Sequence, residues 1–161
     1  MNGRKKMQLL VFMLILAISA IFTGHGSADS IIVLSNGQSV YVPIYSHIYH
    51  GDQEKPFELA ATLSIRNIDL KKEIRLVSAD YFDSDGNFLK KFIENPITLK
   101  KLASIRFIIK SSDKTGGSGA KFIVRWESAE YVNPPLIEAV MIATKSQQGI
   151  SFVSRGQAIK E

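Results

Sequence analysis

The stretch Leu59–Arg66, which reads Leu-Ala-Ala-Thr-Leu-Ser-Ile-Arg, is the clearest structural signal in the chain. Its apolar residues of one parity are Leu59, Ala61, Leu63 and Ile65. Side chains on a β-strand point alternately to opposite faces, so this spacing predicts a strand with one apolar face and one more polar face. The turn-forming residues Asn67-Ile68-Asp69 then end the strand.

Similar short segments, rich in β-branched and aromatic residues, follow one another along the chain and are separated by turn residues. They cover the ranges 40–45, 74–82, 88–92, 105–110, 121–127, 136–144 and 149–154. The turn Asp83-Ser84-Asp85-Gly86-Asn87 predicts a hairpin between the second and third of these segments. The segment 136–144 is apolar almost throughout, so it is a central strand or a buried helix, and its β-branched residues favour the strand. Because Pro43 has no backbone N–H, the segment 40–45 is expected to be an edge strand or the end of a strand.

Short strands at regular spacing, without a convincing amphipathic helix, are typical of a sandwich or barrel. We predict an all-β fold, an immunoglobulin-like antiparallel β-sandwich of about seven to nine strands that forms a single domain over residues 29–161. Trp126, Phe122, Phe107 and Leu63 are expected to meet in its interior. The chain has no cysteine, which excludes disulfides and thiolate chemistry.

Residues 1–28 have the three zones of a signal peptide. Arg4, Lys5 and Lys6 supply positive charge, the segment 9–22 is apolar, and Gly26-Ser27-Ala28 supplies small residues for cleavage. The apolar segment is shorter than the roughly 20 residues needed to span a bilayer. We therefore expect cleavage after Ala28 and an exported, periplasmic or extracellular protein without a membrane span; a retained anchor is the alternative.

The net charge argues against nucleic-acid binding. The whole chain has 20 basic and 15 acidic residues, a formal net charge of +5. Three of the basic residues lie in the signal segment, which leaves 17 against 15, or +2, in the mature chain. Nucleic-acid binders carry clusters of lysine and arginine, which this chain lacks.

Several less common segments make the chain similar to a bacterial family of exported proteins that is known only as a domain of unknown function. The segments are Tyr41–Tyr49, Thr62–Asn67, Asp80–Gly86, Gly116–Ala120, Asn133-Pro134-Pro135 and Ser146–Phe152. The resemblance covers most of the mature chain. It implies an envelope or extracellular location, and it implies no activity or catalytic residue.

An aromatic stripe is the first candidate binding surface. At strand spacing, Tyr41, Tyr45, His47 and Tyr49 fall on one face of their segment. Tyrosine supplies a large contact area at low entropic cost, so such a stripe can bind a partner. The alternative is that these rings cover a neighbouring loop or strand.

His47 and His50 are weak candidates for copper or zinc ligands, with Asp52 or Glu54 close by. At this spacing they fall on opposite faces of a regular strand, and a closed zinc site needs four ligands. No metal or other cofactor is therefore expected.

Two polar loops complete the candidate sites. Gly116–Ala120 lacks the strand–turn–helix context of a nucleophile elbow, so it is interpreted as a glycine loop with tight backbone contacts. Near the C-terminus, Gln147, Gln148 and Arg155 are candidate binding residues. Arg155 has the geometry to bind a carboxylate or phosphate, or else to pair within the fold with an aspartate such as Asp80.

The sequence thus favours a non-enzymatic binding or interaction module of the cell envelope, with an unknown protein or envelope ligand as its partner. The alternative is a small periplasmic metal-binding protein or enzyme that uses His47 and His50. A concave site where both histidines converge with an acid would support this alternative.

Overall fold

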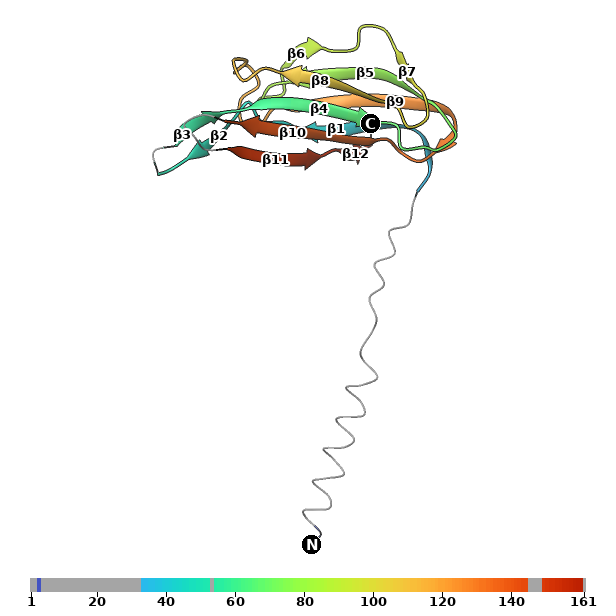
Figure 1. Cartoon of the computed structure of the whole chain (residues 1–161), viewed down its shortest axis with the longest axis horizontal. Coiled ribbons are helices and arrows are strands. Elements are labelled where there is room, and N and C mark those ends of the chain that lie inside the picture. The colour runs from blue at the N-terminus through green and yellow to red at the C-terminus, as the bar shows by residue number, and fades with distance from the viewer. Residues whose placement is uncertain (1–2, 4–32, 53, 145–148, 161) are drawn as a thin grey trace. The chain divides into compact units, whose positions relative to one another are not determined.

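The described part of the chain consists of twelve β-strands in two antiparallel sheets and one separate hairpin (Figure 1). The computed structural model describes residues 3, 33–52, 54–144 and 149–160. The first sheet has six strands, in the order β12 (Gln157–Ile159), β1 (Ser35–Pro43), β9 (Lys121–Val132), β5 (Ile74–Phe82) and β6 (Phe88–Lys91), with β7 (Ile97–Leu99) also paired to β5. The second sheet has four strands, in the order β11 (Ile150–Arg155), β10 (Leu136–Ala143), β4 (Ala60–Arg66) and β8 (Ser104–Ile109). The hairpin is formed by β2 (His47–His50) and β3 (Lys55–Glu58).

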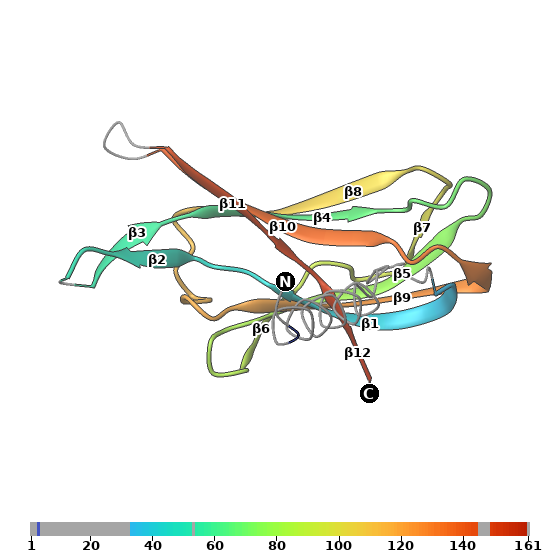
Figure 2. The same ribbon diagram turned by 90° about the horizontal axis from the view of Figure 1, so that it is seen from below.

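The two sheets pack face to face, as Figure 2 shows, and enclose one apolar core. Phe92, in the segment after β6, contacts Phe122 of the first sheet at a ring-centroid distance of 5.3 Å and Phe107 of the second sheet at 5.6 Å. Leu63 and Trp126 are buried in the same cluster, and Phe107 packs against it. The predicted all-β sandwich and its four expected core residues are therefore confirmed.

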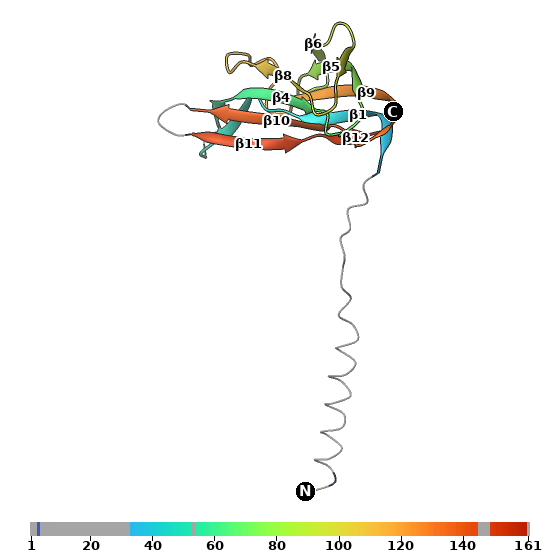
Figure 3. The same cartoon turned by 45° about the vertical axis from the view of Figure 1, so that its right-hand side comes forward.

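The chain crosses from the second sheet to the first at Gly156, between β11 and β12 (Figure 3). The Gly156 N–H donates a hydrogen bond to the Ile137 carbonyl at 2.8 Å. A side chain here would start 2.7 Å from Val40 Cγ1 and 2.9 Å from the Ile137 oxygen. Only glycine therefore fits between Val40 of the first sheet and Ile137 of the second sheet at this position.

The predicted number of seven to nine strands is too low for the described residues, which contain twelve. The strands that the sequence did not indicate are β2, β3, β7 and β12, each of only three or four residues. Strands this short show too few alternations to reveal a period of two. The predicted hairpin is confirmed as β5 and β6, and the segment 136–144 is confirmed as a central strand, β10, between β11 and β4.

The segment 40–45 corresponds to β1, which is not an edge strand. It lies between β9 and β12, and β12 pairs with it over Ser39–Tyr41. The strand ends at Pro43, so the alternative expectation, that proline marks the end of a strand, holds here.

Candidate functional site

The structure divides the expected aromatic stripe into separate parts. Tyr41 lies in β1, where its neighbours Val40 and Val42 point into the core, so Tyr41 occupies the outer side of the first sheet. Tyr45 follows the end of that strand and packs edge-on against Phe152 of β11, with 5.6 Å between ring centroids. Tyr45 thus covers a residue of a neighbouring strand, which is the alternative that the sequence left open for this stripe.

The remaining two members of the stripe, His47 and Tyr49, lie in β2 of the small hairpin. Their rings meet edge-on with 5.0 Å between centroids, and Tyr49 is exposed. His50 instead contacts Phe57 of β3, with 5.7 Å between the rings. The described residues contain no group of three or more His, Cys, Asp or Glu side chains able to hold a metal ion. This geometry gives no support to a site built on both histidines.

The glycine loop is occupied by contacts within the fold, as its glycine content indicated. The Ser84 hydroxyl donates to the Gly116 carbonyl at 3.0 Å and accepts from the Gly119 N–H at 2.9 Å. A Cβ at Gly116 would lie 1.9 Å from the buried Tyr81 hydroxyl oxygen. That hydroxyl also forms a hydrogen bond with the Ser46 hydroxyl at 3.3 Å, and burial raises the pKa of Tyr81.

The expected C-terminal binding residues lie partly outside the described residues. Gln147 and Gln148 belong to the part that the structure does not describe. Arg155 is exposed at the end of β11, directly opposite Glu138 of β10. The suggested pairing of Arg155 with Asp80 is wrong, because Asp80 forms an ion pair with Arg125 at 3.2 Å and lies in the other sheet.

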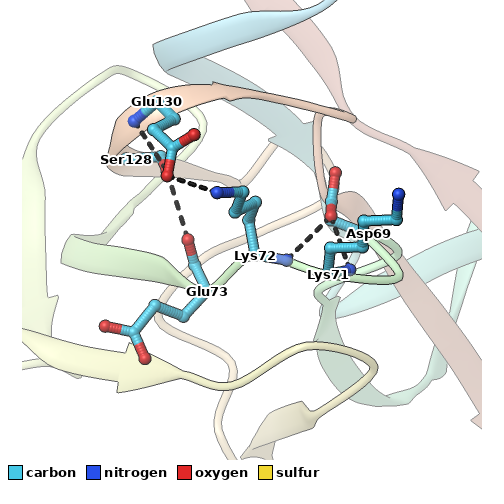
Figure 4. Close-up of polar contacts among 6 residues, drawn as sticks. All are labelled: Asp69, Lys71, Lys72, Glu73, Ser128 and Glu130. Carbon is cyan, nitrogen blue, oxygen red and sulfur yellow. Dashed lines mark hydrogen bonds and ion pairs between the residues drawn. The ribbon is translucent and has the colours of Figure 1, made fainter.

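Behind the strand end at Arg66, the Asn67–Asp69 segment holds three loops together. The buried Asn67 Nδ2 donates to the carbonyls of Lys72, Leu99 and Lys100 at 2.9–3.1 Å. Asp69 accepts the backbone N–H groups of Lys71 and Lys72 with one carboxylate oxygen (Figure 4). Its other carboxylate oxygen accepts the backbone and side-chain N–H groups of Asn133. The Lys71 backbone N–H, followed by those of Asn133 and Lys72, holds the pKa of Asp69 well below its usual range. The sequence indicated only a turn here, because these partners come from distant segments.

A polar hollow of about 620 Å³ lies beside this network. Four of its charged side chains form two ion pairs, Lys72 with Glu130 and Arg75 with Glu127 at 2.8 Å, and Glu73 adds a third carboxylate. The Ser128 hydroxyl closes one side by donating to the Glu73 carbonyl at 3.1 Å (Figure 4). The hollow thus presents mostly paired charges with one carboxylate in excess, and its lining contains no arrangement of a nucleophile with a base.

The outer face of the four-stranded sheet carries an uninterrupted row of apolar or β-branched side chains. The strand register places one residue of each strand side by side. This apolar row consists of Val153, Val140, Thr62 and Ile108. Ile142, two residues further along β10, extends the surface. Ile108 is 57% exposed, Val153 54% and Ile142 47%.

A charged row lies next to the apolar row on the same face, displaced from it by two residues on each strand and on the side opposite to Ile142. It consists of Arg155, Glu138, Ser64 and Arg106. Arg66 comes next along β4; its guanidinium lies 3.8 Å from the Glu138 carboxylate, and its Nε donates to Ser64 Oγ at 3.1 Å. Among the expected binding residues that the structure describes, Arg155 borders this face.

The composition of β10 is the sequence signal for this surface. A continuous apolar strand such as β10 is typical of strands covered on both faces. In the structure, Ala139 and Met141 point into the core, whereas Val140 and Ile142 point outward, where no element of the described chain covers them. Aligning those positions with Ile108 and Val153 requires the strand register, which a single sequence does not contain.

Together these features define an all-β, sandwich-like protein with one exposed apolar sheet face. The chain belongs to the family described as "Protein of unknown function (DUF3124)", which matches residues 37–159. The resemblance to a family of unknown function is thus confirmed. No curated protein matched the chain. Among solved structures, it is similar to the crystal structure of Thermotoga maritima 1070, with 8% identity, a TM-score of 0.46, and coverage of 76% of this chain and 95% of that one.

Proposed function

We propose that this chain is an exported, non-enzymatic interaction module of the bacterial cell envelope that docks a partner on the outer face of its four-stranded sheet. The observation that carries the proposal is the apolar row with Ile142. Surface hydrophobic residues usually occur singly, and contiguous apolar patches mark interaction sites. Here four neighbouring strands each contribute an outward apolar or β-branched side chain at one level.

The composition of β10 supports the same conclusion. Covering an exposed apolar surface gains roughly 25 cal/mol for each Å² removed from water. Ile142 gains little of this from the isolated chain, because it points away from the core and is exposed, whereas Val140 is half-buried between its neighbouring strands. A docked partner would complete the two-sided environment for which this strand's composition is typical.

The proposal is tested with a double variant, Ile108→Asp with Val153→Asp. Tagged protein is incubated with the native envelope fraction, and the bound proteins are quantified by mass spectrometry. The variant should capture at least about tenfold less of the partner than the unchanged protein does, because two charges in an apolar contact are strongly unfavourable.

The matched control is Leu70→Asp with Leu102→Asp, which places the same charges on two exposed leucines outside this face. The control should retain the partner. The free energy of unfolding of both double variants should lie within about 0.5 kcal/mol of that of the unchanged protein, since substitutions of exposed residues rarely cost more. Equal capture by all three proteins, or no protein enriched by any of them, would refute the docking surface.

Export is a separate part of the proposal and rests on the three zones of residues 1–28. These zones lie almost entirely outside the described residues. Within the described residues, no helix has the length and apolar character needed to cross a membrane. N-terminal sequencing of protein from the envelope fraction should give Asp29 as the first residue; a membrane-bound chain that begins at Met1 would contradict cleavage.

The finer immunoglobulin-like class is also part of this proposal. Two antiparallel sheets around a core that includes Trp126 support it. The strand order, with β4 between β10 and β8, differs from that of antibody constant domains. The proposal therefore concerns the sandwich architecture and not the antibody connectivity, and an experimental structure with a closed barrel would contradict it.

A further inference from the structure

The charges beside the apolar row are unevenly distributed. Arg66, Arg106 and Arg155 face a single acid, Glu138, so this part of the face has three positive charges and one negative charge. Glu138 already lies 3.8 Å from Arg66. Within the described chain, no ion pair involves Arg106 or Arg155, and both are exposed. Two guanidinium groups are thus left at the two edges of the sheet.

Arginine suits the recognition of carboxylates. Its planar guanidinium donates two parallel hydrogen bonds to one carboxylate, and it is more weakly hydrated than lysine, so it is favoured in buried or interfacial ion pairs. Arg106 lies on β8 and Arg155 on β11, which are the outermost strands of this sheet. They are three strand spacings apart, or about 14 Å. The neighbouring apolar row lies about 7 Å away, the length of two residues along a strand.

From this arrangement we infer that the docked partner is an acidic protein surface, in which two carboxylates about 14 Å apart bind Arg106 and Arg155 while adjacent apolar side chains cover the apolar row. This inference rests on the proposed function. An extended segment that crosses the four strands would place such acids about four residues apart. A helix lying across them would need acids about eight or about eleven residues apart, because those separations span roughly this distance and keep both side chains on one side of the helix.

A second copy of the chain fits this face less well. A two-fold interface brings the same patch of each subunit together. Each copy would then add three arginines and one glutamate to the same interface, and like charges placed together disfavour association. Charge complementarity therefore favours an acidic partner over self-association.

The inference is tested by reversing both charges, Arg106→Glu with Arg155→Glu. The control, Lys101→Glu with Lys160→Glu, makes the same change of charge at exposed lysines outside the face. The probe is the native envelope fraction, and a photo-crosslinking residue at position 153 identifies the contacting peptide. The arginine variant should capture at least about tenfold less partner than the unchanged protein, and the control should capture nearly the same amount. Capture by the unchanged protein should weaken between about 50 mM and about 500 mM salt, and the crosslinked peptide should contain aspartate or glutamate beside apolar residues.

Each other outcome overturns the inference in a distinct way. If the Ile108/Val153 variant loses capture but the arginine variant and salt have no effect, the docking face stands and the acidic partner is wrong. If neither variant changes capture, both proposals fail. Flotation with phosphatidylglycerol vesicles that depends on the arginines, without a protein crosslink, would identify a lipid surface instead. A dimer in sedimentation equilibrium that Ile108→Asp dissociates would identify a second copy.

Discussion

Gly156 illustrates how a single residue controls the packing of the two sheets. Its backbone φ is not in the left-handed region, so its role is one of space. We expect Gly156→Ala to lower the free energy of unfolding by about 1–3 kcal/mol, because the added methyl group would overlap Val40 and the Ile137 carbonyl. Urea denaturation measures this change.

The control for this substitution is Gly149→Ala, at a position where a Cβ meets nothing within 4 Å. It should change the stability by less than about 0.5 kcal/mol. Equal effects of the two substitutions would show that the crossing at Gly156 has room for a side chain.

Asp69 makes the stability depend on pH in a defined direction. Its folded pKa lies below the ordinary value of 3.8 because backbone N–H groups stabilise the carboxylate. A lowered folded pKa contributes stability above the unfolded pKa, and this contribution is lost as the pH falls towards the folded value. The unchanged protein should therefore be more stable than Asp69→Asn at neutral pH, and the difference should shrink once the pH falls below about 4.

Urea unfolding of both proteins at a series of pH values tests this expectation. Glu94→Gln, at an exposed carboxylate, is the control for removing one negative charge. A stability difference between the unchanged protein and Asp69→Asn that remains constant down to acidic pH would contradict the role of the ionised carboxylate.

At the scale of elements, the glycine loop and β5 form one packed unit through Gly116 and Tyr81. Gly116→Ala would place a methyl group against the Tyr81 hydroxyl, and Tyr81→Phe would remove that hydroxyl. We expect the two substitutions to be coupled: the cost of Gly116→Ala should fall by about 1 kcal/mol when Tyr81 is phenylalanine. A double-mutant cycle from four urea unfolding curves measures this coupling.

The single variant Tyr81→Phe should itself cost about 1 kcal/mol, the usual net value of a hydrogen bond, because it removes the partner of the buried Ser46 hydroxyl. Additive effects of the two substitutions would mean that the loop moves away from β5 without a penalty.

The long strands were predictable because they contain several apolar alternations, as in β4 and β5. The exact range 74–82 was recovered for β5. The short strand β7 was not, because its pairing with β5 depends on residues more than twenty positions away. The apolar row is a similar case: its members come from strands that are distant in sequence, and register alone places them together.

At the scale of the whole molecule, the sheets share one core through Phe92 and its contacts on both sides. We therefore expect one cooperative unfolding transition. Trp126, the single tryptophan, lies in the first sheet, so its fluorescence reports on that sheet, whereas far-ultraviolet circular dichroism reports on all strands. The two urea curves should superimpose; separate midpoints would show that the sheets unfold independently.

The sequence by itself determined the all-β class, the main strands, the β5–β6 hairpin and most of the core, because period-two patterning and turn residues act over a few neighbouring positions. Only the tertiary structure decided the order of the strands, the contacts of the aromatic stripe, the partner of Asp80 and the continuity of the apolar row. These features depend on register and on contacts between distant segments, and a one-residue shift in register would move every outward side chain to the opposite face.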